Sequence, residues 1–128
     1  MPANRLIVLG RSIAGIELNQ PRRAVEEALG PGNSRRRGVV AYFSGHLVVD
    51  YWFHDQLTTR VESLETRWSG FHTRSGVHVG STRQALDALG VSCTDGRCAL
   101  ADGRGADAPG TGFTMQHGKI AAILVTYG

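Results

Sequence analysis

Apolar residues follow two patterns along the chain: a helical spacing in two segments, and short runs between turn-forming residues elsewhere. In the segments 21–29 and 81–89 apolar residues lie three and four positions apart, which is the spacing of one helix face. Pro21 suits the first position of a helix, while Ser81 and Gln84 form a capping-box pattern at the start of the second. The two predicted apolar helix faces consist of Ala24, Val25, Ala28 and Leu29, and of Ala85, Leu86 and Leu89.

Short apolar runs separated by turn-forming residues follow each predicted helix, and they predict strands. After the first helix we expect strands over 39–43, 47–53 and 57–67, with turns at 44–45 and 54–55. The segment 5–9 is a candidate for an additional edge strand. After the second helix the predicted strands cover 91–93, 98–100, 111–115 and 120–127, with a loop over 101–110 and a turn at 116–118.

The two halves of the chain resemble each other. The segment 15–26 aligns with 76–87 without a gap, matching apolar, acidic, arginine and glycine positions in the same order. We interpret this as a duplication: repeat 1 covers about 11–67, a linker about 68–75, and repeat 2 about 76–128. A lone helix on three strands is marginally stable. The sequence therefore predicts a single α+β domain over 1–128, in which two tandem repeats of one helix plus a three-stranded antiparallel meander pack on a shared core.

Composition agrees with one globular domain. The chain has 128 residues, of which 41% are hydrophobic and 20% charged, and its 17 glycines favour many turns and short elements. No apolar run approaches the roughly 20 residues that a membrane span needs. The net charge of +3 is small for a nucleic-acid-binding protein. We therefore predict neither a membrane span nor a nucleic-acid partner.

The two cysteines flank a turn. Cys93 and Cys98 lie on either side of Asp95–Gly96, a strong signal for a two-residue hairpin turn that would bring the thiols opposite each other. A disulfide is the interpretation that we prefer; the alternatives are two unrelated buried thiols or half of a metal site. The metal site lacks a second Cys or His pair at ligand spacing. A disulfide favours an oxidising compartment, so we expect a secreted or extracytoplasmic protein in its mature form, since the first residues do not form a signal peptide.

The entry to the second helix carries a motif. Residues 76–86 read Gly-Val-x-Val-Gly-Ser-Thr-x-x-x-Leu, which resembles the BamE-like outer-membrane-assembly lipoproteins and the tandem β-lactamase-inhibitor proteins. The segments 11–15 and 74–76, with the two late cysteines, resemble a group of secreted actinobacterial proteins. The resemblance covers about 11–128 and implies non-catalytic binders, either inhibitors or envelope scaffolds. The chain departs from these families in having no cysteine before Cys93 to carry a lipid and a cysteine pair only in its second half.

Signatures of catalysis are lacking in the sequence. No two of the five histidines, His46, His54, His72, His78 and His117, lie at helical metal-ligand spacing. No nucleophile motif occurs, and the two glycine-rich stretches at 103–105 and 110–112 do not join a strand to a helix as a phosphate loop does. We therefore predict no catalytic residue, no cofactor and no metal. A small hydrolase stays an alternative, and it would need two histidines, or a histidine and an aspartate, in one cleft.

Basic and aromatic residues supply the candidates for binding. The run Arg35–Arg37 is interpreted as a solvated loop or as a contact for an anion or an acidic partner. Aromatic residues gather on the predicted strands 39–43 and 47–53, and neighbours such as Tyr51 and Trp52 must point to opposite faces. One face would pack under the helix, and the other would be covered by the second repeat or exposed to a partner. The residues that we predict for binding are Tyr51, Trp52, Trp68 and Arg60.

These observations favour a non-catalytic, secreted or cell-envelope module that binds another protein, with inhibitor-like and envelope-scaffold proteins as its specific forms. A module that binds a small molecule or a glycan with an aromatic sheet face is the alternative from a different class.

Overall fold

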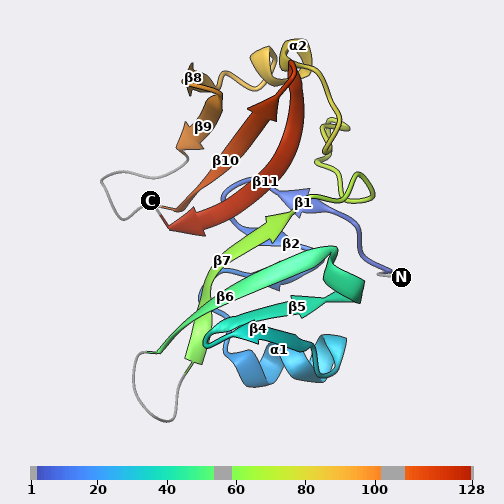
Figure 1. Ribbon diagram of the computed structural model, residues 1–128, viewed down its shortest axis with the longest axis vertical. Helices are drawn as coiled ribbons and strands as arrows, with labels where there is room; N and C mark the ends of the chain where they lie inside the picture. The colour runs from blue at the N-terminus through green and yellow to red at the C-terminus, as the bar shows by residue number, and fades with distance from the viewer. Residues whose placement is uncertain (1–2, 54–58, 102–108, 128) are drawn as a thin grey trace.

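The computed structural model describes residues 3–53, 59–101 and 109–127, and these form two antiparallel sheets and two helices (Figure 1). The small sheet has the order β1-β2-β3, with β1 Ile7–Val8, β2 Ser12–Ile13 and β3 Ile16–Glu17. The helices are α1, Arg22–Leu29, and α2, Arg83–Asp87. The large sheet has the order β4-β5-β6-β7-β11-β10-β9-β8. Its strands are β4 Asn33–Arg36, β5 Val39–Tyr42, β6 Leu47–Phe53, β7 Thr59–Thr66, β8 Ser92–Thr94, β9 Arg97–Ala101, β10 Pro109–Gln116 and β11 Lys119–Tyr127.

The prediction of an α+β domain built from two units of a helix and a three-stranded meander is wrong. The structure is mostly β, with 51% strand and 15% helix, and its strands belong to sheets of three and eight strands. The second helix has only five residues, and strands form at 12–13, 16–17 and 33–36, where we expected none. Asn33–Arg36 is wholly polar and exposed, so it carries no alternation of apolar residues. Two-residue strands are too short to show any period.

Several predicted strands are nevertheless present. The segments predicted over 39–43 and 47–53 form β5 and β6, and those over 111–115 and 120–127 form β10 and β11. The predicted edge strand at 5–9 is β1, although it belongs to the small sheet. The turn predicted at 54–55 and most of the loop predicted over 101–110 lie outside the described residues. The division into two repeats and a linker stays a prediction.

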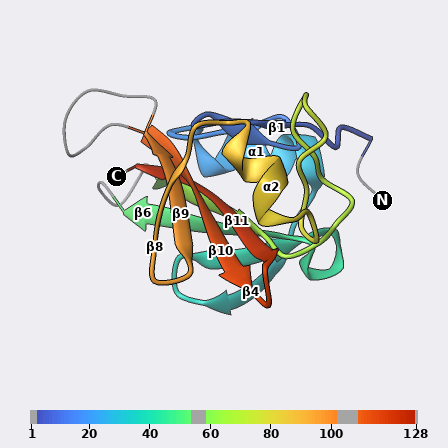
Figure 2. The ribbon, with the colours of Figure 1, turned by 90° about the horizontal axis from the view of Figure 1, so that it is seen from above.

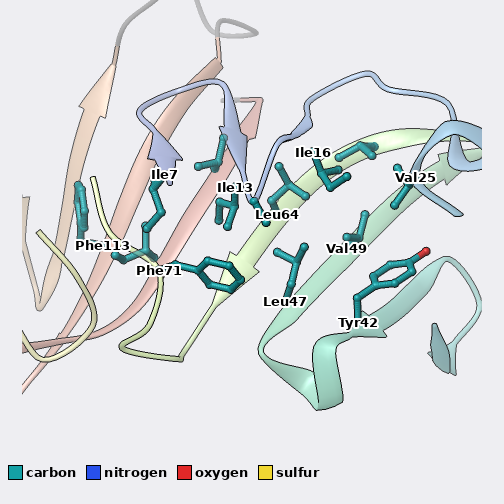
Figure 3. Packing of buried hydrophobic residues seen from close by; sticks show 14 of the residues in the cluster. Ile7, Ile13, Ile16, Val25, Tyr42, Leu47, Val49, Leu64, Phe71 and Phe113 are labelled. Carbon is teal, nitrogen blue, oxygen red and sulfur yellow. The ribbon is translucent and has the colours of Figure 1, made fainter. Parts of the chain in front are cut away.

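The fold has two layers. Figure 2 shows both helices and β1 on the same side of the large sheet, and the core lies between this layer and the sheet. The register places Val49, Leu64 and Val125 side by side on β6, β7 and β11, facing the core. Buried side chains from the other layer pack against them (Figure 3). These are Ile7, Ile13, Ile16, Val25, Phe71, Val77 and Leu86.

The hairpin β8–β9 confirms the predicted disulfide. Cys93 and Cys98 are direct partners in the register and are bonded to each other. Asp95 and Gly96 have φ of 50° and 77°, so both turn residues are in the left-handed region that a two-residue hairpin turn of this kind requires. Asp tolerates that region and Gly adopts it without a steric cost, which explains why this pair marked the turn in the sequence.

Loss of the disulfide is expected to lower the free energy of unfolding by about 2 kcal/mol, because the bond closes a loop of only about six residues and so restricts the unfolded chain little. The variant Cys93→Ala/Cys98→Ala, compared with the oxidised wild type in urea unfolding, measures this loss. A loss of more than about 4 kcal/mol would show that the hairpin depends on the bond for its folded conformation as well. Mass spectrometry without reductant verifies the oxidised state of the reference.

Candidate functional site

One face of the large sheet carries no second layer in the described part of the chain. This outer face is the one turned away from the helices and the small sheet (Figure 2). Neighbouring strands place one residue each in a continuous row across it, and the end of the row on β10, β9 and β8 consists of small side chains. From β4 to β8 the cross-strand row consists of Asn33, Ala41, Val48, Glu65, Leu124, Gly112, Ala99 and Ser92.

At the β4 end of the outer face lies a hollow with a volume of ≈ 370 Å³, which we call the arginine groove. Val39 and Val48 contribute apolar side chains to it, and the other lining residues are mostly charged. The complete lining is Arg35, Arg36, Val39, Gly45, Val48, Glu65 and Arg67.

A β-bulge brings two consecutive arginines into this groove. Ser34 pairs with Val40 and Arg36 pairs with Val39, so Arg35 is the extra residue between two ladder positions. Strict alternation would send Arg35 and Arg36 to opposite faces, whereas a bulge re-aims side chains and lets both reach the outer face. Gly45, with φ of 92°, lets the Arg35 guanidinium lie close to the backbone of residue 45, because a Cβ at that residue would be only 2.9 Å from the Arg35 Nη2 atom.

The charges of the groove do not balance. The Arg67 Nε atom lies 3.2 Å from the Glu65 Oε1 atom, so these two charges form an ion pair. Within the described residues, Arg35 and Arg36 form no ion pair with a carboxylate. Three guanidinium groups therefore face one carboxylate, which leaves the groove with an excess of positive charge.

Two residues that follow groove residues in the sequence, His46 after Gly45 and Trp68 after Arg67, belong to an aromatic cluster. We call this cluster the aromatic stack, and it consists of Arg5, His46, Trp68 and Phe71. The His46 ring lies parallel to the Trp68 indole, with centroids 4.3 Å apart and planes inclined by 12°. The Arg5 guanidinium lies over the same indole, 5.4 Å from its centroid. Phe71 meets the indole edge-on at 5.1 Å. Trp68 is thus held on several sides while it remains half-exposed.

Backbone features fix the position of the stack. The Thr66 hydroxyl donates to the His46 carbonyl at 2.8 Å and accepts the Trp68 N–H at 3.1 Å. The indole lies directly on Gly70, where an added Cβ would come within 2.2 Å of the ring. Phe43 has a positive φ of 54°, which is strained for a bulky residue. Strain of this kind is retained only where the surrounding structure enforces it.

The structure separates the four residues that we predicted for binding. Trp68 belongs to the aromatic stack, whereas Trp52 lies on β6 with 40% of its surface exposed and stacks on Tyr127 at 6.3 Å. Arg60 is the register partner of Trp52, and its Nη1 atom donates to the Asn19 carbonyl at 2.9 Å. Tyr51 is only 2% exposed and lies in the core. Trp52 and Arg60 are therefore neighbours, while Tyr51 is not on the surface.

Tyr51 instead forms a buried pair with Tyr42. Their hydroxyl oxygens are 2.7 Å apart, and the Arg22 guanidinium of α1 lies 5.2 Å from the centre of the Tyr51 ring. Burial raises the pKa of both phenols above the ordinary value, and the hydrogen bond to Tyr42 raises the pKa of Tyr51 further. Both groups therefore stay protonated at neutral pH and hold the core together rather than act as acids.

The histidines do not gather into a catalytic or metal centre among the described residues. His72 and His78 are partners in an isolated β-bridge, but each turns its Nδ1 atom to the carbonyl of the residue that follows it. His46 is part of the aromatic stack, and His117 lies in the β10–β11 turn. His54 lies outside the described residues. No group of three His, Cys, Asp or Glu side chains in the described ranges could hold a metal ion.

Sequence reasoning missed most residues of this site. The Arg35–Arg37 run is visible in the sequence, which predicts a loop there, whereas Arg35 and Arg36 belong to the edge strand β4. Val48, Glu65 and Arg67 carried no signal, because only the register of β5, β6 and β7 brings them to one place.

Comparison of the chain with protein-family models, with curated proteins and with solved structures gives no match in any of the three. Neither helix in the described ranges has the length and the apolar character that crossing a membrane requires.

Proposed function

We propose that this chain is a non-catalytic module that binds another protein with its outer face in an extracytoplasmic compartment. The observation that carries the proposal is the cross-strand row, which runs over all eight strands and has no second layer above it in the described residues. Eight strands about 4.8 Å apart span about 34 Å, and a standard interface, in which each partner buries roughly 800 Å², is about 28 Å across if it is square. The outer face is therefore wide enough for such an interface.

The residues around the row support binding rather than catalysis. Small side chains such as Gly112 and Ala99 allow the backbone of a partner to approach the sheet closely. Arginine and tryptophan are enriched among the residues that dominate binding energy, and both types occur on the large sheet, in the arginine groove and at the exposed Trp52. The motif at 76–86, with its resemblance to inhibitor and envelope-scaffold proteins, points to the same class of function.

The disulfide supports the extracytoplasmic location in this proposal. Bonds of this kind form and persist outside the reducing cytosol, so the Cys93–Cys98 bond is expected in a secreted or envelope protein.

A blocked outer face tests the proposal. Ala99→Arg places a long charged side chain in the cross-strand row, and Ala88→Arg makes the same change at an exposed position after α2. Wild-type protein and both variants are immobilised and exposed to the culture fluid and envelope fraction of the source organism. We expect wild type and Ala88→Arg to retain the same protein and Ala99→Arg to lose at least 90% of it. Equal retention by the two variants, or no retained protein with wild type, would contradict the proposal.

A further inference from the structure

We propose that the arginine groove is a carboxylate-binding subsite that receives acidic side chains of a protein partner. This inference rests on the proposed function, because the groove forms one end of the outer face. It adds the chemistry of the ligand: aspartate or glutamate side chains on an exposed segment of the partner.

The first support is the way in which the arginines converge. A charged edge strand by itself is a common protection against strand-to-strand aggregation, and it needs only charge at the edge. In β4, however, the bulge at Arg35 directs two consecutive arginines to one face. Gly45 then leaves the space in which the Arg35 guanidinium lies, since a Cβ there would be 2.9 Å from it. Protection of an edge requires neither feature.

The second support is the unbalanced charge. Glu65 is the only carboxylate among the groove's lining residues, and it pairs with Arg67 at 3.2 Å. Arg35 and Arg36 have no carboxylate partner among the described residues. Like charges held close together repel, and a bound anion removes this repulsion. The groove thus offers two guanidinium groups to an incoming carboxylate.

The third support is the match between the lining and an acidic side chain. Guanidinium groups bind carboxylates through paired, charge-assisted hydrogen bonds. Val39 and Val48 offer apolar surface to the methylene groups of aspartate or glutamate. The volume of ≈ 370 Å³ is large enough for an acidic side chain.

The neighbouring aromatic residues favour a protein over a nucleic acid. Single-stranded nucleic acids bind to basic grooves in which aromatic rings offer a free face for base stacking. The Trp68 indole, which follows Arg67 of the groove along the chain, has the His46 ring parallel to it at 4.3 Å and the Arg5 guanidinium over it at 5.4 Å. Two groups of the protein already contact this ring, which makes it a poor platform for a base.

Acidic peptide binding tests the subsite on the full chain. Fluorescein-labelled peptides of ten glutamates and of ten glutamines are titrated with the protein at low ionic strength, and binding is followed by fluorescence anisotropy. We expect the glutamate peptide to bind and the glutamine peptide to bind at least tenfold more weakly. The variant Arg35→Gln/Arg36→Gln is expected to weaken binding of the glutamate peptide by at least tenfold, because each lost hydrogen bond to a charged group costs more than a neutral one.

A matched control separates the groove from net charge. Arg74→Gln/Arg83→Gln removes the same charge from exposed positions outside the groove, and it is expected to weaken binding by less than threefold. Equal losses in the two double variants, or no binding of the glutamate peptide by wild type, would overturn the subsite. A ten-nucleotide oligo-dT that binds as tightly, with the same dependence on Arg35 and Arg36, would overturn the choice of a protein ligand.

The two proposals fail in distinguishable ways. The peptide titration measures binding of a carboxylate-rich ligand to the groove and needs no natural partner. The capture experiment with Ala99→Arg measures whether a partner binds at the other end of the outer face. Suppose that Ala99→Arg loses the captured protein, while Arg35→Gln/Arg36→Gln binds the glutamate peptide as tightly as wild type does. This result overturns the subsite and leaves the proposed function standing. Capture that is unaffected by Ala99→Arg overturns the proposed function, whatever the peptide does.

Discussion

Replacing Phe71 with alanine is expected to lower the free energy of unfolding by about 3–5 kcal/mol, the cost of emptying a large aromatic site in a packed core. Phe71 is fully buried, and its ring lies in the core seen in Figure 3. It also contacts Trp68 and Phe43, at centroid distances of 5.1 and 6.5 Å, so it supports the aromatic stack from within. Urea unfolding of the variant and the wild type measures the loss.

Phe71→Leu is the control for this prediction. Leucine keeps much of the buried volume, so it is expected to cost about 2 kcal/mol or less. In a Trp52→Phe background the tryptophan emission comes from Trp68 alone and reports the stack separately. The alanine variant is expected to shift this emission to longer wavelength in the folded state, because the indole loses its edge contact. A loss below about 1 kcal/mol in Phe71→Ala would mean that the core collapses around the site and that the stack does not depend on Phe71.

Alkaline pH is expected to destabilise the protein through the buried tyrosine pair. Burial raises the pKa of Tyr42 and of Tyr51 in the folded state above the ordinary value of 10.0. The unfolded chain therefore loses these protons first as the pH rises, and deprotonation favours unfolding. Their contribution to stability is complete below pH 10 and declines above it, by at most about 1.4 kcal/mol per pH unit for each tyrosine. Urea unfolding between pH 8 and pH 12 measures the decline.

The double variant Tyr42→Phe/Tyr51→Phe separates these two groups from the rest of the chain. It removes both hydroxyls together, so at pH 7 it is expected to change stability little. Tyr51→Phe alone leaves the Tyr42 hydroxyl without its partner at 2.7 Å and is expected to cost about 1–3 kcal/mol at pH 7. If the free energy of unfolding of the double variant falls above pH 10 as steeply as that of the wild type, the tyrosine pair is not the source of the alkaline sensitivity.

The elements predicted correctly from the sequence are those whose signal is local. The Asp95–Gly96 turn marked the cystine hairpin, because its left-handed backbone selects those residue types. A run of apolar and aromatic residues, interrupted only by Asp50, marked β6, Leu47–Phe53. By contrast, β4 is an edge strand that buries no side chain, so its sequence Asn-Ser-Arg-Arg has nothing to alternate. Its pairing is set by β5, and no local pattern in residues 33–36 records that.

The candidate site was less predictable than the fold, because it depends on register. Alternation shows that Tyr51 and Trp52 point to opposite faces, but it does not show which face the other layer covers. The structure answers this: Tyr51 faces the core under α1 and Trp52 is exposed. In the same way, the Arg35–Arg36 run was visible in the sequence, while the bulge that turns both side chains to one face is a property of the β4–β5 pair.

The pairing of β7 with β11 has a consequence for how the protein is made. Residues Ser63–Thr66 pair with residues Ile123–Thr126, so about 60 positions separate the partners at the middle of the large sheet. Of the described strands, β11 is the last to leave the ribosome, and it occupies an interior position in the sheet order. Until it arrives, β7 lacks its neighbour and the strands on either side cannot form one sheet. Contacts of such long sequence separation slow folding, so the large sheet is expected to stay incomplete until β11 has been synthesised and then to close in one late step.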